Sequence, residues 1–228
     1  MVVVKLLQNV SSPPVAPLKE KLRSKSLPKG SILKLAGALA QLEAKSDTWP
    51  QIEQSVADAL LAIATGQVDY WTQTLKPVRD RLKPYLEREF GDTRSSPAAR
   101  QFSSTILALL FRDDADVLAK LAVRGDRAQQ RELVRSLQPH AKAAIETLKK
   151  IEASIQDLPK VEDKDLEKLV SSSIIRFHLG DRGQLWSRMK MTPDPTVRTE
   201  LFLQLQAFDV PVLALFEQLQ KEKRPSCR

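Results

Sequence analysis

The chain has 228 residues, which suffice for one large domain or a run of about five helical hairpins. Hydrophobic residues make up 42% of it, enough for a buried core, whereas the presence of only 7 glycines disfavours a protein built on phosphate-binding glycine loops. The net charge is +8, but residues 1–30 carry 6 basic and 1 acidic side chains and residues 221–228 carry 4 and 1. The sequence between these ends is therefore neutral, which disfavours nucleic-acid recognition by the folded part.

The first 27 residues are predicted to form a basic, Pro/Ser-rich tail or linker, because the segment 11–17 (SSPPVAP) cannot continue a helix. Helical structure is expected to begin after Pro28-Lys29-Gly30, where apolar residues recur at steps of three and four. The segment Thr48-Trp49-Pro50-Gln51 predicts the start of the next helix, with the threonine as its cap. Gly66 is expected to end that helix.

Between residues 68 and 219 the chain is a series of short apolar stripes separated by proline, glycine or polar turns. Each stripe predicts a helix with one buried face. Asp114 is expected to cap one helix, Pro84 either to kink a helix or to begin a new one, and the charged stretch 160–168 to lead into another. The predicted helices are 68–76, 78–90, 98–111, 115–123, 129–137, 141–155, 169–178, 185–189, 197–208 and 212–219, followed by a basic tail over 221–228.

One sequence pattern occurs twice, with an offset of 62 residues. Thr74-Leu75-Lys76-Pro77 is followed by Leu86-Glu87, and Ser136-Leu137-Gln138-Pro139 is followed by Leu148-Lys149. Each copy runs from one predicted helix into the next, which indicates a helix–Pro–helix unit used more than once. Because helices joined by short connections lie side by side, we expect an all-α stack of antiparallel helix pairs.

The cysteine content and the hydropathy of the sequence are used to predict the cellular compartment. Cys227 is the only cysteine, so no disulfide can form within the chain, which favours a reducing environment. No run of the sequence approaches the ~18 apolar residues of a membrane span, and the apolar start at 1–7 is too short for a signal peptide. We expect a cytoplasmic protein, although a soluble region of a membrane-anchored chain would have the same composition.

Residues 179–201 (LGDRGQLWSRMKMTPDPTVRTEL) resemble a HEAT-type unit, in which a Pro-Asp-Pro turn separates two helices. Two further stretches fit the same pattern, 66–70 followed by 75–82 and 116–121 followed by 137–140. Over about residues 55–220 the chain is similar to helical-repeat regions of large bacterial, mainly planctomycete, proteins. Those proteins join the region to a serine/threonine kinase domain or to a formylglycine-generating-enzyme-like (sulfatase-modifying factor) domain.

The resemblance implies a HEAT-like α-solenoid over residues 28–220 that serves as a non-catalytic interaction region. The sequence departs from the resemblance where the catalytic domains would be expected. Lys5 follows three valines, as in a kinase strand, but no glycine-rich loop, His-Arg-Asp loop or Asp-Phe-Gly motif comes after it. We therefore do not expect the chain to be an enzyme.

Several side chains that could carry chemistry have a structural interpretation that we favour. Asp113, Asp114 and Asp116 lack the glycine turn and the distal glutamate of a calcium loop, and helix capping accounts for them. His140 and His178 have no His or Cys at a metal-ligand spacing and no visible proton-transfer partner. We expect no catalytic residue, no metal and no cofactor.

The three tryptophans, Trp49, Trp71 and Trp186, lie among apolar residues. They are predicted to anchor helix packing rather than to form a platform on which bases stack. Arg198, in the turn that follows Pro193-Asp194-Pro195, is expected to bond locally to the adjoining repeat, with a contact to a partner carboxylate as the alternative.

The predicted partner-binding residues are basic side chains near the repeated turns, because in a solenoid the second helix of each pair lines the exposed groove. They are Arg79, Arg81, Arg131, Arg135, Lys142 and Arg198. The predicted function is a non-catalytic scaffold or protein-interaction module. The alternatives are an accessory region of a kinase or formylglycine-generating-type enzyme, and a weak binder of nucleic acid or anionic surfaces through the basic tails.

Overall fold

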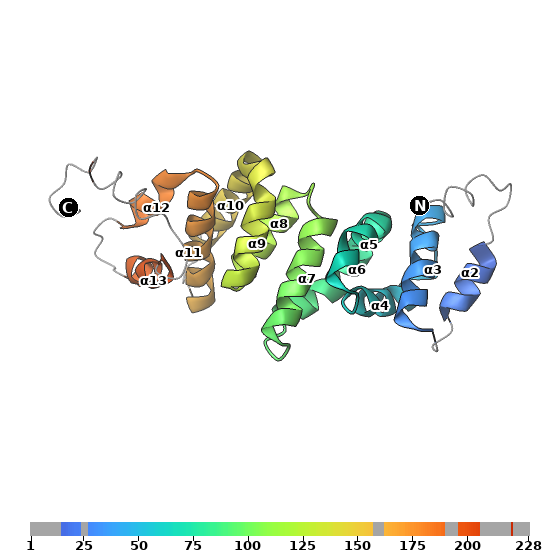
Figure 1. Ribbon diagram of the computed structural model, residues 1–228. Coiled ribbons are helices and arrows are strands. Elements are labelled where there is room, and N and C mark those ends of the chain that lie inside the picture. Colours follow the sequence, from blue (N-terminus) through green and yellow to red (C-terminus); the bar gives the residue numbers. More distant parts are fainter. Residues whose placement is uncertain (1–14, 24–26, 157–161, 190–195, 206–219, 221–228) are drawn as a thin grey trace. The chain divides into compact units, whose positions relative to one another are not determined.

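The computed structural model describes residues 15–23, 27–156, 162–189, 196–205 and 220 (Figure 1). Every regular element in these ranges is a helix, which confirms the all-α prediction. The chain divides into two compact units, Met1–Arg112 and Asp113–Arg228. Each unit has its own set of fully buried apolar side chains.

The first unit consists of short helices in two rows. Its elements are α2 (Val15–Arg23), α3 (Lys29–Leu42), α4 (Trp49–Leu60), the 3₁₀ turn η1 (Thr65–Gln67), α5 (Val68–Leu75), the 3₁₀ turn η2 (Lys76–Val78), α6 (Arg79–Gly91) and α7 (Pro97–Leu110). Helix α2 packs on α4, α3 on α5, α4 on α6 and α5 on α7. Because each helix contacts the one two places further along the chain, even-numbered helices form one row and odd-numbered helices the other.

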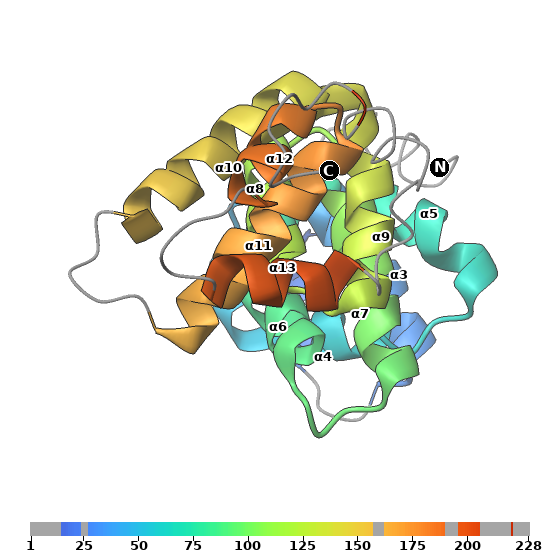
Figure 2. The same cartoon turned by 90° about the vertical axis from the view of Figure 1, so that its left-hand side faces the viewer.

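The second unit is organised around one central helix. Its elements are α8 (Ala115–Arg124), α9 (Arg127–Leu137), the 3₁₀ turn η3 (Gln138–His140), α10 (Ala141–Gln156), α11 (Asp163–His178), α12 (Arg182–Met189) and α13 (Thr196–Leu205). Helix α11 contacts α8, α9, α10, α12 and α13, and Figure 2 shows α13 crossing α11. Every residue from 169 to 177 is buried, which is typical of a helix enclosed on all sides.

The repeated sequence pattern has the same backbone structure in both copies. In the first copy α5 ends at Leu75, the turn η2 contains Pro77, and α6 follows at once. In the second copy α9 ends at Leu137, the turn η3 contains Pro139, and α10 follows at once. The first residue of each turn has nearly the same backbone angles, φ −50° and ψ −39° at Lys76 and φ −51° and ψ −45° at Gln138. The predicted helix–Pro–helix unit is confirmed at both positions.

Helical structure begins earlier than predicted. Val15–Arg23 forms α2, although it lies in the segment expected to be a tail. Leu22 is buried, and Lys19 Nζ lies 3.0 Å from Glu43 Oε1 of the segment that follows α3. The apolar contact and the ion pair attach α2 to α3, so this part of the basic N-terminal segment belongs to the folded unit.

Helix α4 begins directly after Thr48 with Pro50 in its first turn, as predicted, but the expected capping bond and the expected end are both wrong. The Thr48 hydroxyl makes no hydrogen bond within the described residues, whereas the Ser46 hydroxyl accepts one from the Thr48 backbone N–H at 3.3 Å. The helix begins at Trp49 without a side-chain cap and ends at Leu60, before Gly66, which lies in η1. Thr48 has helical backbone angles, φ −76° and ψ −26°, instead of the extended ones of a capping residue, and the Gln51 N–H donates to the Thr48 backbone oxygen at 3.1 Å.

Other predicted boundaries differ in smaller ways. Helix α6 continues through Pro84, so of the two predicted alternatives the proline does not begin a new helix. The charged stretch belongs to α11 from Asp163 onward, six residues before the predicted start at Leu169. The predicted turn at 193–195 and the predicted helix at 212–219 lie outside the described residues.

The start of α9 is fixed by a complete capping box. Asp126 Oδ1 accepts hydrogen bonds from the N–H groups of Ala128 and Gln129, and the Gln129 side chain accepts one from the Asp126 N–H at 2.8 Å. We expect the substitution Asp126→Ala to lower the free energy of unfolding by about 1 kcal/mol. The substitution Asp126→Asn should leave stability nearly unchanged, because asparagine caps as well as aspartate. Urea denaturation followed by circular dichroism checks this, and an equal loss for both variants would contradict the capping role.

Candidate functional site

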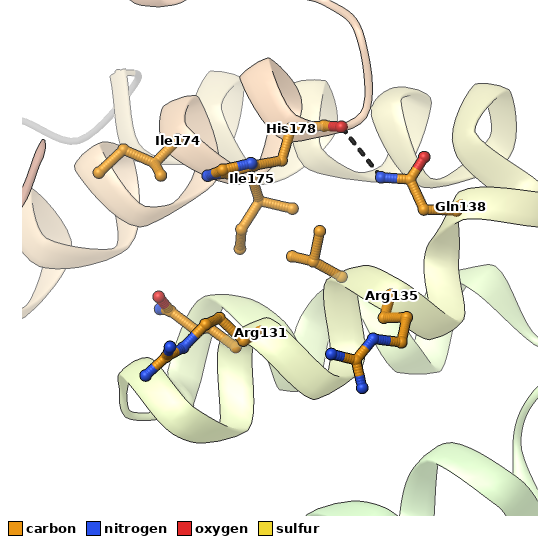
Figure 3. Close-up of a pocket in the computed structure, with 8 residues that line it drawn as sticks. Arg131, Arg135, Gln138, Ile174, Ile175 and His178 are labelled. Carbon is orange, nitrogen blue, oxygen red and sulfur yellow. Dashed lines mark hydrogen bonds between the residues drawn. The ribbon is translucent and has the colours of Figure 1, made fainter. Parts of the chain in front are cut away.

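The best-defined hollow in the second unit lies between α9 and α11. It has a volume of about 270 Å³ and is open to solvent on one side. Its lining residues are Gln130, Arg131, Val134, Arg135, Gln138, Ile174, Ile175 and His178. Figure 3 shows Ile175 on α11 pointing toward α9, which carries Arg131 and Arg135, whereas Ile174 packs in the core cluster with Phe177 and Leu201. Ile174 and Ile175 are 0% and 1% exposed, so the exposed lining of the hollow consists of Arg131, Arg135 and Gln138.

The two arginines lie one helical turn apart on α9, and both are exposed. Arg135 Nη1 lies 3.4 Å from Glu132 Oε2, and the Arg135 side chain is 80% exposed. A contact of this length between solvated groups contributes little. The guanidinium of Arg135 is thus accessible to a carboxylate from outside the chain.

The far end of the hollow is fixed by a hydrogen bond between the two helices. Gln138 Nε2 donates to the backbone oxygen of His178 at 3.0 Å (Figure 3). This bond ties the turn η3 to the last residue of α11. The repeated turn therefore positions the wall of the hollow.

Gln130 gives the hollow an unsatisfied polar atom. The residue is 3% exposed, and its side-chain oxygen has no hydrogen-bond donor within the described residues. A buried amide oxygen without a donor costs about 1–3 kcal/mol relative to one that is hydrogen-bonded. That oxygen has almost no accessible surface, so the cost falls on the folded chain itself.

Of the four predicted partner-binding residues in the second unit, two line the hollow. Arg131 and Arg135 both line the hollow. Lys142 is exposed on α10, and Arg198 is half-buried on α13. Within the second unit, the pair on α9 is the part of the prediction that adjoins a hollow.

The two predicted residues of the first unit are half-buried on α6. Arg79 lies over the Phe111 ring, 4.9 Å from its centroid, and donates to the Leu110 backbone oxygen at 3.3 Å. The cation–π contact and the hydrogen bond fix the Arg79 side chain against the end of α7. Its position gives it a packing role within the first unit.

A buried ionic cluster at α10, α11 and α12 was not predicted. Glu152 Oε2 lies 2.7 Å from Arg176 Nη1 and 3.0 Å from Arg188 Nη2, and Glu152 Oε1 accepts a hydrogen bond from Ser172 at 2.7 Å. Arg176 also pairs with Asp181 at 2.6 Å. The two arginines balance the two acids, so the cluster is neutral overall.

The turn after α11 places Asp181 in this cluster. Gly180 has φ 98°, a conformation that favours glycine, and the Asp181 N–H donates to the Arg176 backbone oxygen at 2.9 Å. One feature of the sequence could have indicated that this ionic cluster is buried. Glu152 occupies the same helical face as Leu148 and Ile155, so it stands at an apolar position of α10.

The predicted acidic cluster has a structural role at α8. Asp114 Oδ1 accepts a hydrogen bond from the Val117 N–H at 3.1 Å, which confirms it as the helix cap. Lys120 Nζ lies 2.6 Å from Asp116 Oδ2 and, as the largest cause, holds the pKa of Asp116 below its ordinary value. Thr147 donates to the other Asp116 oxygen at 3.2 Å and connects α8 to α10.

Two of the three tryptophans are core residues, as predicted. Trp49 is 0% exposed and Trp71 is 8% exposed, whereas Trp186 is half-buried. Among the residues that the structure describes, no helix is long and apolar enough to cross a membrane. In the same residues no group of three or more His, Cys, Asp or Glu side chains could hold a metal ion.

Comparison with known proteins gives no relative. No protein-family model, curated protein or solved structure matches the chain.

Proposed function

We propose that the protein is a HEAT-like α-solenoid that acts as a non-catalytic scaffold or protein-interaction module. The observation that carries this proposal is the regular neighbour pattern of the helices. In the first unit each helix packs on the helix two places further along, and in the second unit α8 packs on α10, α9 on α11 and α11 on α13. Stacked helix pairs produce this pattern.

The recurrence of one turn supports the same interpretation. The turns η2 and η3 begin with residues of matching backbone angles and stand 62 residues apart, each between a shorter and a longer helix. Repeats of a supersecondary unit bury a continuous core when they stack, and their exposed helix faces then form an extended surface for binding. Helix α9 precedes one such turn and presents Arg131 and Arg135 on its exposed face.

The proposed partner is another protein or a neighbouring domain of a longer chain, in the cytoplasm. Site-specific photo-crosslinking in extracts of the native cells tests this. A benzoylphenylalanine at Arg131 or Arg135 is expected to capture one discrete polypeptide. The same probe at Lys150, which is exposed on α10, serves as the matched control and is expected to capture none.

The captured polypeptide is then identified by mass spectrometry, purified and titrated against the unmodified chain. Saturable binding of that polypeptide supports the proposal. The proposal fails if folded protein with the probe on α9 gives no polypeptide adduct, or if the adduct contains nucleic acid.

A further inference from the structure

We infer that the surface under α2, formed by α3, α4 and the connection between them, binds basic amphipathic helices of partner proteins, and that α2 is an internal copy of this ligand. The inference rests on the proposed function, because it gives the module a binding surface in the first unit and names the chemistry of its partner. Figure 1 shows α2 beside α3, and α2 packs on both α3 and α4. The occupant of the surface is thus visible in the structure.

Helix α2 is basic and amphipathic. Its apolar residues Val15, Leu18 and Leu22 recur at steps of three and four, so they share one face of the helix. Leu22 is buried and the other two are half-buried, which places this face against the rest of the unit. Lys19 and Arg23 stand four residues apart beside the apolar stripe. The ligand that this surface accepts is therefore a helix with an apolar stripe and two cations along its edge.

The surface supplies acceptors for both cations. Lys19 Nζ lies 3.0 Å from Glu43 Oε1 and 3.3 Å from Asp47 Oδ1. Arg23 Nε donates to Gln51 Oε1 at 3.0 Å. With α2 in place, the Glu43 and Asp47 side chains are still 40% and 80% exposed. Both carboxylates can therefore be reached by a cation that arrives from solvent.

Bonds that do not involve α2 hold these acceptors in position. The Trp49 indole Nε1 donates to the Glu43 backbone oxygen at 3.3 Å, and the Glu43 N–H donates to the Leu39 backbone oxygen at 2.7 Å. Trp49 is 0% exposed, so the connection between α3 and α4 is anchored in the core. The surface is thus preorganised for a helix, whichever chain supplies it.

The attachment of α2 is weak compared with that of its neighbours. Leu22 alone is buried among the nine residues of α2, whereas α3 buries five residues and α4 six. A helix of this length is marginal in isolation, and ion pairs with partly exposed carboxylates contribute little. Segments with few buried apolar residues open while the rest of the fold remains intact. Helix α2 therefore dissociates at times, and a partner helix takes its place.

Competition by α2 gives the inference a distinctive consequence. Because α2 is tethered to its surface, it lowers the apparent affinity of any helix that arrives from outside. Substitutions that weaken the attachment of α2 should accordingly tighten the binding of an outside helix. A substitution that only damages the fold would have the opposite effect.

The test measures fluorescence polarisation of a labelled peptide with the full chain. The probe is a capped peptide of residues 15–23, held helical by a lactam between Lys21 and the substitution Pro17→Glu, two exposed positions four residues apart. The double substitution Lys19→Glu and Leu22→Ala in the protein is expected to tighten probe binding about tenfold. The substitution Lys21→Glu in the protein reverses an exposed charge of α2 and is expected to leave probe binding unchanged.

A charge exchange locates the binding. Added to the double variant, Glu43→Lys is expected to weaken probe binding by about tenfold or more. A probe that carries Lys19→Glu should recover binding to this protein, because the ion pair is restored with its signs reversed. Glu146→Lys, at an exposed carboxylate of the second unit, is the matched control and should change nothing. Circular dichroism verifies that each variant is folded.

Hydrogen exchange of the unmodified chain needs no variant and keeps the inference falsifiable if a variant does not fold. The amides of α2 are expected to exchange faster than those of α3 and α4, and faster still when an excess of probe displaces α2. Exchange of α2 as slow as that of α3 and α4 would make it a permanent part of the fold and overturn the inference. Equal binding of the probe to the unmodified chain and to the double variant would also overturn it.

Two further outcomes separate this inference from its rivals. A dimer of the unmodified chain that dissociates in the double variant would make a second copy the occupant and overturn the assignment to a partner protein. A discrete polypeptide adduct at α9 without probe binding would overturn this inference and leave the interaction module intact. Probe binding as expected, without any adduct at α9, would support the surface under α2 and reject the one on α9.

Discussion

The substitution Glu152→Ala is expected to lower the free energy of unfolding of the second unit by about 3–5 kcal/mol. Glu152 is 3% exposed and is the carboxylate that contacts both Arg176 and Arg188. Its removal leaves Arg188 without this buried partner and Arg176 with Asp181 alone. A charge that remains buried after its partner is removed accounts for most of the loss. Urea denaturation followed by circular dichroism measures it.

An exposed glutamate of the same helix provides the control. Glu146 lies 2.8 Å from Lys149 Nζ, but its side chain is 65% exposed. The substitution Glu146→Ala should change stability by less than about 1 kcal/mol, because exposed ion pairs contribute little. Similar losses for the two variants would show that the burial of the cluster is not what makes Glu152 important.

A second variant separates charge from hydrogen bonding at the same position. The substitution Glu152→Gln keeps an oxygen that can accept from Ser172, whose hydroxyl lies 2.7 Å away, but removes the negative charge. We expect its stability to fall between those of the natural chain and Glu152→Ala. If Glu152→Gln is as stable as the natural chain, the cluster is held by hydrogen bonds and not by charge balance.

Local signals predicted the helices well. Apolar periodicity located most of them, and Asp114 caps α8 as predicted, because a cap acts only on the N–H groups of the next turn. The repeated prolines predicted the turns η2 and η3 for a similar reason. Proline restricts its own backbone angle and needs no partner elsewhere in the chain.

Predictions that depended on competition between neighbours were less successful. Thr48 has the right residue type for a cap, but its backbone angles are helical, so its hydroxyl caps no N–H group, and the residue type alone does not predict those angles. Segment 15–23 has the composition of a basic tail, but in the structure Leu22 is buried and α2 packs on α3. The second case is decided by contacts with residues of another helix, and these are not encoded in the local pattern.

The candidate site shows the same difference between features set by the local sequence and features set by helix packing. Arg131 and Arg135 could be selected from the sequence because they lie beside a repeated turn. Their proximity to Ile174 and His178 could not, because it depends on how α11 packs on α9. The buried Glu152 could have been suspected from its apolar position, whereas its partners on α11 and α12 required the fold.

The substitution Trp49→Ala is expected to lower the free energy of unfolding of the first unit by about 3–5 kcal/mol. Trp49 is 0% exposed and is the first residue of α4, and its indole Nε1 donates to the Glu43 backbone oxygen at 3.3 Å. Truncation removes a large buried ring and leaves that oxygen without the indole donor. Urea denaturation followed by circular dichroism measures the change.

The conservative variant and an exposed aromatic residue show which part of Trp49 matters. The substitution Trp49→Phe keeps most of the ring and loses the N–H donor, so its loss should be smaller than that of Trp49→Ala. The substitution Tyr70→Ala, at a side chain that is 52% exposed, should cost about 1 kcal/mol or less. If Trp49→Ala costs no more than Tyr70→Ala, the ring is not part of the core, and the segment between α3 and α4 must be fixed by other contacts. In that case the buried face of α4 itself, rather than its first residue, joins the rows of the first unit.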